Sequence, residues 1–259
     1  MKTSIVTTLC LLAILTSSAA AGSDGPIGPE DRILFPGAAR FILVGPYGGI
    51  DAAFHKGRFS TTSNGLLCCS FDEGDGFGLV AGFKAFIPIG GRFDLSPRIL
   101  YENPGGDFTA ILQQYPIRGR NNSVEYVTLD NTLEVTLHML SAELLATYTF
   151  TSFGLYAALG PSAGFILGNR FVKTETIVGP PGVTYLDGNT SQEMYTGTSD
   201  LVRGATFTLR GGLGAKIPIS RSITLNPEVL YGFPLSTVST DGSWKVSTLQ
   251  ATLGVLFPL

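Results

Sequence analysis

His138, Ser141 and Glu143 lie close together in one segment, and they are the residue types of a nucleophilic hydrolase. In such a site a histidine base within hydrogen-bond reach activates the serine hydroxyl, and a carboxylate orients the histidine. The segment has the pattern of a β-strand, in which successive side chains point to opposite faces. His138 and Ser141 therefore face opposite sides unless a bulge near Leu140 shifts the register. We expect His138 at a strand rim, Glu143 in an ion pair, and no catalytic residues.

Cys68 and Cys69 are adjacent, and the carboxylates of Asp72, Glu73 and Asp75 follow them. A vicinal disulfide is compatible with an oxidising compartment, and carboxylates are ligands that Ca²⁺ accepts. The spacing matches no known calcium loop. We therefore predict a solvated acidic loop, with no metal ion and no cofactor.

Charged residues form a second constellation on the polar faces of the predicted strands. Its six members are Lys84, Arg98, Glu143, Arg210, Lys216 and Glu228. Buried charges must pair or carry a desolvation penalty of several kcal/mol each. Lys84 and Arg98 lie opposite each other across a tight turn, with Glu143 on the next strand to neutralise them. Glu228 has Arg210 and Lys216 on its neighbouring strand. We predict that these residues form a structural network of ion pairs that fills the lumen. The alternative is a narrow, gated channel that conducts ions.

Eight strand candidates position these residues. They cover 40–54, 76–89, 93–103, 133–150, 153–167, 204–218, 222–234 and 245–258. Within them apolar residues alternate with small or polar ones, which is the period-two pattern of a strand. Tight turns near 90–92, 151–152 and 220–221 alternate with longer connections near 59–75, 104–132 and 168–203. Short turns at one end and long loops at the other are typical of transmembrane β-barrels.

An internal repeat relates two of the predicted hairpins. Phe77–Pro104 aligns with Phe207–Pro234 without a gap. Arg98 and Glu228 occupy equivalent positions in the two copies and carry opposite charge. We interpret the chain as two halves of four strands each.

The N-terminus indicates export. Lys2, an apolar run from Ile5 to Leu15 and the Ala19–Ala21 cleavage site make residues 1–21 a signal peptide. We expect 22–39 to be a periplasmic lead-in and 40–259 to be the barrel.

Composition agrees with a membrane barrel. The chain is 44% hydrophobic and 14% charged, whereas about 25% charged is usual in soluble proteins. No mature apolar run is long enough for a membrane helix, so the apolar residues must be spread over alternating strands. Aromatic residues near strand ends, Trp244 among them, suit the girdles at the two membrane interfaces. The net charge of −3 with no basic cluster predicts no nucleic-acid partner.

Three groups of motifs carry a family resemblance. They are the Gly-x-x-x-x-Ile-Pro-Ile endings at Gly82–Ile89 and Gly212–Ile219, the segments Leu140–Tyr148 and Leu155–Pro161, and the closing Leu253–Leu259. In these motifs the sequence resembles the outer-membrane β-barrel domain family common in Bacteroidetes and Chlorobi, called PorT-like, and in architecture the OmpA transmembrane domain. The resemblance implies an all-β, eight-stranded antiparallel up-and-down transmembrane barrel in the bacterial outer membrane, with short periplasmic turns and longer external loops.

For such a barrel we expect a structural, adhesive or loop-mediated binding role rather than an enzymatic one. The expected partners are outer-membrane lipid, the barrel-assembly machinery during biogenesis, and an unknown extracellular partner at loops 104–132 and 168–203. One alternative is a lipid-modifying enzyme resembling the lipid A deacylases, in which His138 and Ser141 would be catalytic residues. The other is a secreted soluble lipocalin-like carrier, which would turn its apolar face inward.

Overall fold

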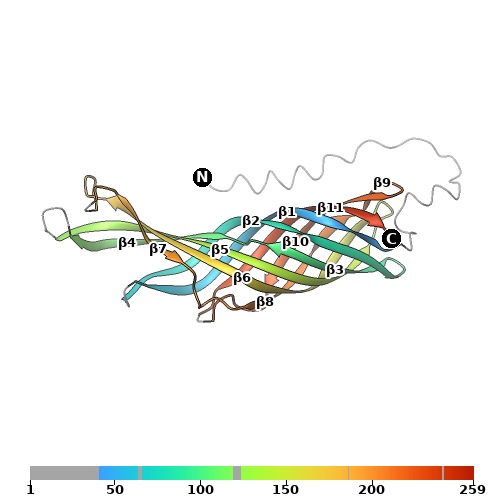
Figure 1. The fold of residues 1–259 in the computed structure, drawn as a ribbon, viewed down its shortest axis with the longest axis horizontal. Coiled ribbons are helices and arrows are strands. Elements are labelled where there is room, and N and C mark those ends of the chain that lie inside the picture. Colours follow the sequence, from blue (N-terminus) through green and yellow to red (C-terminus); the bar gives the residue numbers. More distant parts are fainter. Residues whose placement is uncertain (1–40, 64–65, 119–123, 186, 241) are drawn as a thin grey trace. The chain divides into compact units, whose positions relative to one another are not determined.

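The computed structural model describes residues 41–259 except 64–65, 119–123, 186 and 241. The predicted signal peptide 1–21 and lead-in 22–39 lie outside the described residues. All regular elements of the described part are β-strands (Figure 1). They are β1 Leu43–Ser63, β2 Leu66–Gly90, β3 Phe93–Glu102, β4 Gly106–Arg118, β5 Val124–Thr149, β6 Leu155–Gly179, β7 Ser191–Gly197, β8 Ala205–Ala215, β9 Ile217–Ser220, β10 Ile223–Pro234 and β11 Lys245–Pro258.

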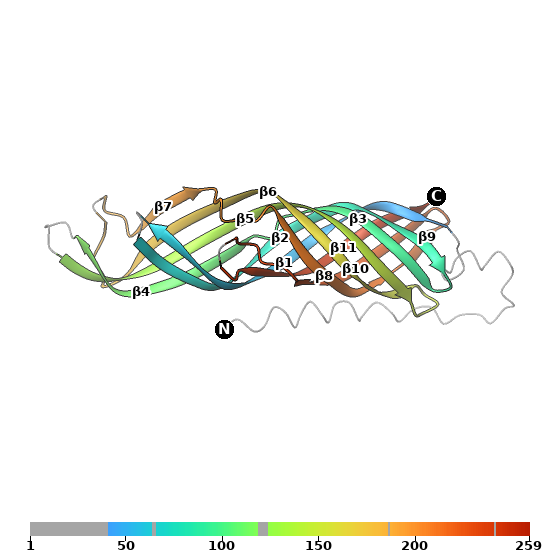
Figure 2. The ribbon, with the colours of Figure 1, turned by 90° about the horizontal axis from the view of Figure 1, so that it is seen from below.

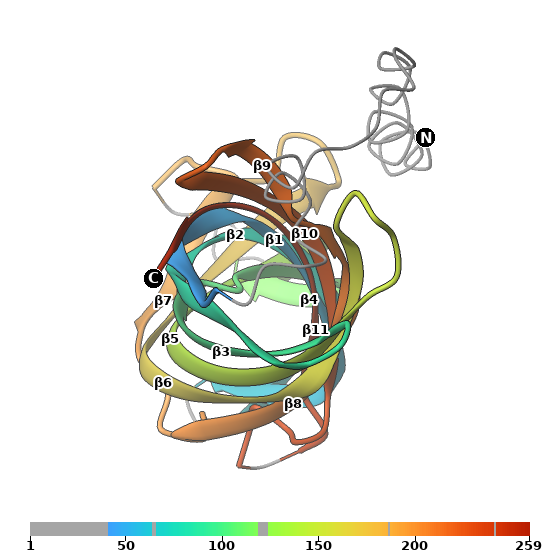
Figure 3. The ribbon, with the colours of Figure 1, turned by 90° about the vertical axis from the view of Figure 1, so that its right-hand side faces the viewer.

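Eight of these strands close into an antiparallel ring, seen end-on in Figure 3. Within the described residues the order around the ring is β1, β2, β3, β5, β6, β8, β10, β11 and back to β1. The closing ladder runs from Leu43 opposite Pro258 to Lys56 opposite Lys245. Closure gives each strand of the ring a hydrogen-bonded neighbour on both sides, which a lipid environment demands. The predicted eight-stranded barrel is confirmed.

The two faces of the wall differ in polarity. On β2 the outward side chains of Phe77, Leu79 and Phe83 are at least 65% exposed, whereas the inward side chains of Lys84 and Phe86 are at most 2% exposed. An apolar outer face and a polar inner face are the arrangement of a membrane barrel. A lipocalin has the reverse arrangement, so the soluble-carrier alternative is wrong.

Pro227 explains an interruption in the wall. A proline has no N–H group to donate to the neighbouring strand. Opposite Pro227 the neighbouring strand is interrupted, since β8 ends at Ala215 and β9 begins at Ile217. The Asn226 Nδ2 atom donates to the Ala215 carbonyl oxygen at 2.8 Å. The side chain therefore satisfies a backbone acceptor beside the gap.

The predicted external loops are wrong in extent, because most of their residues are β-strand. β1 and β2 continue through the predicted loop 59–75, β4 and the start of β5 occupy 104–132, and β6 and β7 occupy much of 168–203. The prediction followed the regular alternation of apolar and polar residues in the ring, whereas strand pairing continues beyond it.

The longer strands form a separate feature at one end of the ring. β4, β7 and the adjoining ends of β5 and β6 extend past the ends of β8, β10 and β11, as Figures 1 and 2 show. We call these four segments the projecting sheet. They pair in the order β4, β5, β6, β7.

The lipid-facing belt predicts a position-dependent effect of charge. Leu213 on β8 is 60% exposed on the outer face. Leu213→Arg should destabilise the barrel in a bilayer, lowering its free energy of unfolding by about 2 kcal/mol or more. Thr109→Arg on β4, in the projecting sheet, should change it by less than about 0.5 kcal/mol. Urea-dependent folding into vesicles, scored by the electrophoretic shift between unboiled and boiled samples, measures both. Equal effects of the two substitutions would contradict a membrane belt at Leu213.

Candidate functional site

The six charged residues singled out in the sequence all point into the ring. Each is at most 5% exposed: Lys84, Arg98, Glu143, Arg210, Lys216 and Glu228. They meet three further polar residues that sequence reasoning missed, namely Asp94, Glu102 and Tyr156. Asp94 and Glu102 share the parity of Arg98 on β3, so the alternation of that strand contained the signal for both.

Glu228 is the centre of the first group. The Arg98 guanidinium binds both of its carboxylate oxygens, with Nη2 2.9 Å from Oε2. Lys84 Nζ lies 3.6 Å from Oε1. The Tyr156 hydroxyl donates to Oε2 and accepts a hydrogen bond from Asn226 Nδ2 at 2.8 Å. A planar guanidinium on a carboxylate gives two charge-assisted hydrogen bonds in a fixed geometry.

Arg210 organises the second group. Its Nη2 lies 2.5 Å from Glu102 Oε2, and its Nη1 lies 2.8 Å from Glu143 Oε1. Glu102 also accepts hydrogen bonds from the Ser141 hydroxyl and, at 2.9 Å, from Gln250 Nε2. One cation thus serves two carboxylates, and neutral donors from other strands stabilise the excess negative charge.

Lys216 forms a third group nearer the short turns. Its ammonium pairs with Asp94, and it lies 4.2 Å from the centre of the Phe86 ring. A cation over an aromatic face is attracted by the ring quadrupole.

The predicted pairings within the network are wrong, although its members are present. Glu228 pairs with Arg98 and Lys84, not with Arg210 and Lys216 on its own side. β3 and β10 stand on opposite sides of the ring, and the interior of an eight-stranded barrel is only as wide as its side chains. Long side chains therefore meet the opposite wall.

The repeat places equivalent residues face to face. Arg98 and Glu228 are 130 positions apart, which is the offset of the repeat. Phe86 and Lys216 have the same offset and also touch. The hairpins that carry them, β2–β3 and β8–β10, occupy opposite sides of the ring.

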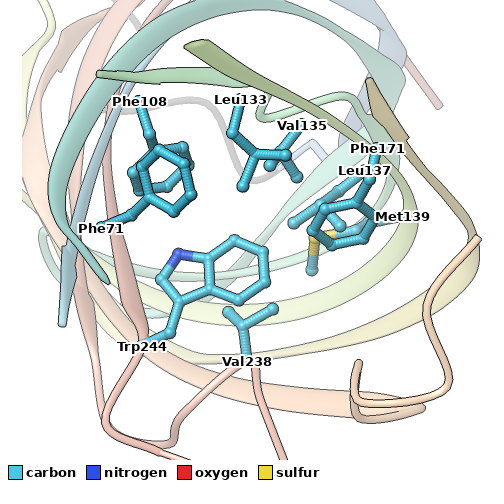
Figure 4. Packing of buried hydrophobic residues seen from close by; sticks show 9 residues of the cluster. All are labelled: Phe71, Phe108, Leu133, Val135, Leu137, Met139, Phe171, Val238 and Trp244. Atoms are coloured by element: carbon cyan, nitrogen blue, oxygen red, sulfur yellow. The ribbon is translucent and has the colours of Figure 1, made fainter. Parts of the chain in front are cut away.

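The other half of the lumen is apolar (Figure 4). Nine buried side chains from the wall and from the loop before β11 pack together: Phe71, Phe108, Leu133, Val135, Leu137, Met139, Phe171, Val238 and Trp244. We call this cluster the apolar plug. At its border with the ion pairs, Glu102, Arg210, Leu137 and Val238 line a cavity of about 30 Å³, with room for about two water molecules.

Trp244 corrects the predicted aromatic girdle. Phe77, Tyr101, Tyr148 and Tyr231 are 39–77% exposed on the outer face, as a girdle requires, but Trp244 is 2% exposed inside the ring. It lies directly before β11, at the end of the loop that follows β10. A position near a strand end does not distinguish these two orientations in the sequence.

The hydrolase constellation does not assemble. Ser141 points into the lumen and donates to Glu102, whereas His138 lies on the outer face, where its Nδ1 is 2.5 Å from the Tyr101 hydroxyl. The side chains of Cys68 and Cys69 lie outside the described residues. Elsewhere in the described part of the chain, no three His, Cys, Asp or Glu residues gather in a way that suits a metal ion.

The projecting sheet has a small core of its own. Val127, Leu129 and Ile177 are buried there, with Val183 and Tyr185 packed against them. Burial, with Glu175 and Asp187 nearby, raises the pKa of the Tyr185 phenol. Other side chains of the sheet are exposed, including large apolar and aromatic ones: Ile111, Tyr115, Val124, Tyr126, Val178, Met194 and Tyr195.

A family model agrees with this architecture. A model of the family described as outer membrane protein beta-barrel domain matches residues 31–238. Among solved structures, the chain is similar to Neisserial surface protein A at 14% identity and a TM-score of 0.37, over 84% of this chain and 99% of that one. It is similar to the outer membrane protease OmpT of Escherichia coli at 9% identity and a TM-score of 0.35, over 87% and 98%. The attachment invasion locus protein of Yersinia pestis follows at 12% and 0.25, over 82% and 99%. No curated protein matches the chain.

The central ion pair predicts a strong asymmetry between single and double substitutions. Glu228→Gln leaves Arg98 and Lys84 buried without a carboxylate and should destabilise the barrel by about 3–5 kcal/mol. Arg98→Met combined with Glu228→Gln removes one charge of each sign and should recover a large part of that loss. Equilibrium urea unfolding of the barrel in lipid vesicles gives both values. A double variant no more stable than Glu228→Gln would show that the pair is not the source of the loss.

Proposed function

Since this chain belongs to the outer membrane protein β-barrel domain family and resides in the bacterial outer membrane, we propose that it displays a binding surface outside the cell. In this proposal the ring anchors the chain, and the projecting sheet contacts an extracellular partner. The segments 104–132 and 168–203, predicted as the partner site, supply most of that sheet. The motifs shared with the PorT-like group favour that branch of the family.

The observation that carries the proposal is the contrast between a filled lumen and an open sheet. Ion pairs occupy one half of the lumen and the apolar plug occupies the other. The projecting sheet, by contrast, exposes 65% of Tyr126, 58% of Val178 and 47% of Tyr195. Aromatic side chains on a rigid scaffold outside the membrane suit binding, because they give large contact area at low entropy cost.

The same proposal assigns the remaining partners. Outer-membrane lipid contacts the apolar outer face of the ring. The barrel-assembly machinery recognises the final strand β11, whose Phe257 is 43% exposed. No enzymatic role is proposed, because His138 and Ser141 lie on opposite faces of β5.

Substitution of the exposed apolar surface tests the binding role. Cells that display the protein should adhere to at least one member of a panel of matrix proteins, glycans and bacterial cells better than cells without it. A variant with four exposed side chains replaced by serine, at Tyr115, Tyr126, Val178 and Tyr195, should lose this adhesion. A matched control replaces four exposed polar residues of β4 and β7 by alanine, at Thr109, Gln113, Gln192 and Thr196, and should retain it.

Heat-dependent migration in SDS must show that every variant is folded. Adhesion that survives in the serine variant, or that is absent from the wild-type chain on the whole panel, would overturn the proposal.

The filled lumen also predicts that the barrel does not conduct. The paired charges fill one half of the lumen and the packed apolar side chains fill the other. Together they leave no water-filled path through the barrel. Folded protein added to a planar bilayer at neutral pH should give no steps of current beyond those of a boiled sample. Steady unitary currents from the folded fraction would instead favour the gated-conductance alternative.

A further inference from the structure

Residues 235–240 and 242–244, which we call the mouth loop, lie between β10 and β11 and turn part of their side chains into the barrel. Val238, Ser239 and Trp244 are at most 4% exposed. The Val238 N–H donates to the Trp244 carbonyl at 2.8 Å, and the Arg203 N–H donates to the Val238 carbonyl at 2.7 Å. The mouth loop is thus a compact unit, closed on itself and tied to the segment before β8, rather than a surface excursion.

Trp244 anchors the mouth loop among three strands of the wall. Its ring stacks on His55 of β1, with centroids 5.7 Å apart and planes at 27°. It meets Phe108 of β4 and Phe171 of β6 edge-on, with centroids 6.3 Å away in each case. Figure 4 shows the indole between Phe108, Phe171 and Val238. Trp244 is also the single tryptophan of the chain.

His55 holds the indole through one defined tautomer. The indole Nε1 donates to His55 Nδ1 at 3.1 Å, and His55 Nε2 lies 3.0 Å from the Gly105 carbonyl oxygen. An indole N–H only donates and a carbonyl only accepts, so Nδ1 must be bare and Nε2 must carry the hydrogen. The ring is 1% exposed. A Cβ at Gly106 would lie 2.5 Å from the imidazole, so the ring occupies the space that a side chain at position 106 would need.

We propose that His55 and Trp244 form a pH-sensitive latch, which holds the mouth loop in the barrel while His55 is neutral and releases it when His55 is protonated. A proton taken from solvent onto Nδ1 places an N–H against the indole N–H. Both donors then lose their partners in a buried site, and a charge is added there, which the packed state disfavours.

Of the charged groups around His55, Asp75 attracts the proton and offsets part of that cost, but burial outweighs it. On the neighbouring elements five described side chains are exposed and point away from the ring: Lys56 of β1, Glu73 and Asp75 of β2, Asp107 of β4 and Lys245 of β11. Lys173 and Glu175, buried where β6 pairs with β5 and β7, bind each other at 2.9 Å. Asp51 is buried on the same face of β1, with Ala53 between it and His55. Glu73 and Asp75 flank Gly74, the register partner of His55. Asp75 is the one of the two that attracts a proton on His55, so it is the one to control for.

Release of the latch would uncover a defined part of the lumen. Ser236 and Val238 of the mouth loop line the cavity above Glu102 and Arg210. Without the loop, that cavity and three side chains of the apolar plug, Phe71, Phe108 and Phe171, would be accessible from the barrel mouth. The latch is independent of what the projecting sheet binds.

The emission of Trp244 reports the latch directly. Because the closed, buried site disfavours the proton, release should come well below the ordinary imidazole pKa. In folded protein taken from about pH 8 to about pH 3.5 we therefore expect a reversible red shift of the emission. Quenching by acrylamide should rise several-fold over the same range. The unboiled sample must still migrate as folded barrel in SDS. A folded wild-type protein whose emission and quenching stay constant down to about pH 3.5 would overturn the proposal without any variant.

Two substitutions assign the transition. His55→Gln keeps an acceptor for the indole and a donor for the Gly105 carbonyl but does not titrate, so it should abolish the pH response and keep the neutral spectrum. Asp75→Asn should leave the wild-type response intact. A response that persists in folded His55→Gln, or that disappears in Asp75→Asn, would overturn the assignment to His55.

Discussion

The contact between Arg98 and Glu228 is the constraint on which the lumen depends. A ring of eight strands has an interior only as wide as its side chains, and any charge placed there must find its counter-charge inside. The bidentate geometry fixes β3 against β10 across the barrel. Lys84 and the Tyr156 hydroxyl make the other contacts of the Glu228 carboxylate. The second and third groups, around Arg210 and Lys216, then connect further strands in the same way.

The inward set of charges follows from alternation alone, because parity decides which face a side chain takes. The outward position of Phe77 and Leu79 follows from the same rule. Alternation does not predict which charges pair. Arg98 and Glu228 meet because β3 and β10 lie opposite each other, and that depends on the number of strands in the ring. Local pattern assigned Glu228 to Arg210, its neighbour on the next strand, and that was wrong.

Other features depend on tertiary context in a different way. Trp244 has the sequence setting of a girdle residue, and only the inward fold of the mouth loop separates it from Tyr231, which does face outward. The projecting sheet was missed because its outer face is not uniformly apolar. Tyr126 and Val178 nevertheless belong to continuous strands, and Val127, Leu129 and Ile177 give the sheet a core where no bilayer supports it.

The repeat has a consequence for the ancestry of the barrel. If two identical half-barrels once associated around a two-fold axis, each residue beside that axis faced its own copy, and a charged residue there would have met a like charge. Arg98 and Glu228 lie at equivalent positions 130 residues apart and attract each other. Opposite charges at equivalent positions require that the two be encoded separately. On that ancestry, the salt bridge at the centre of the lumen arose only after the two halves had become separately encoded copies that were free to diverge.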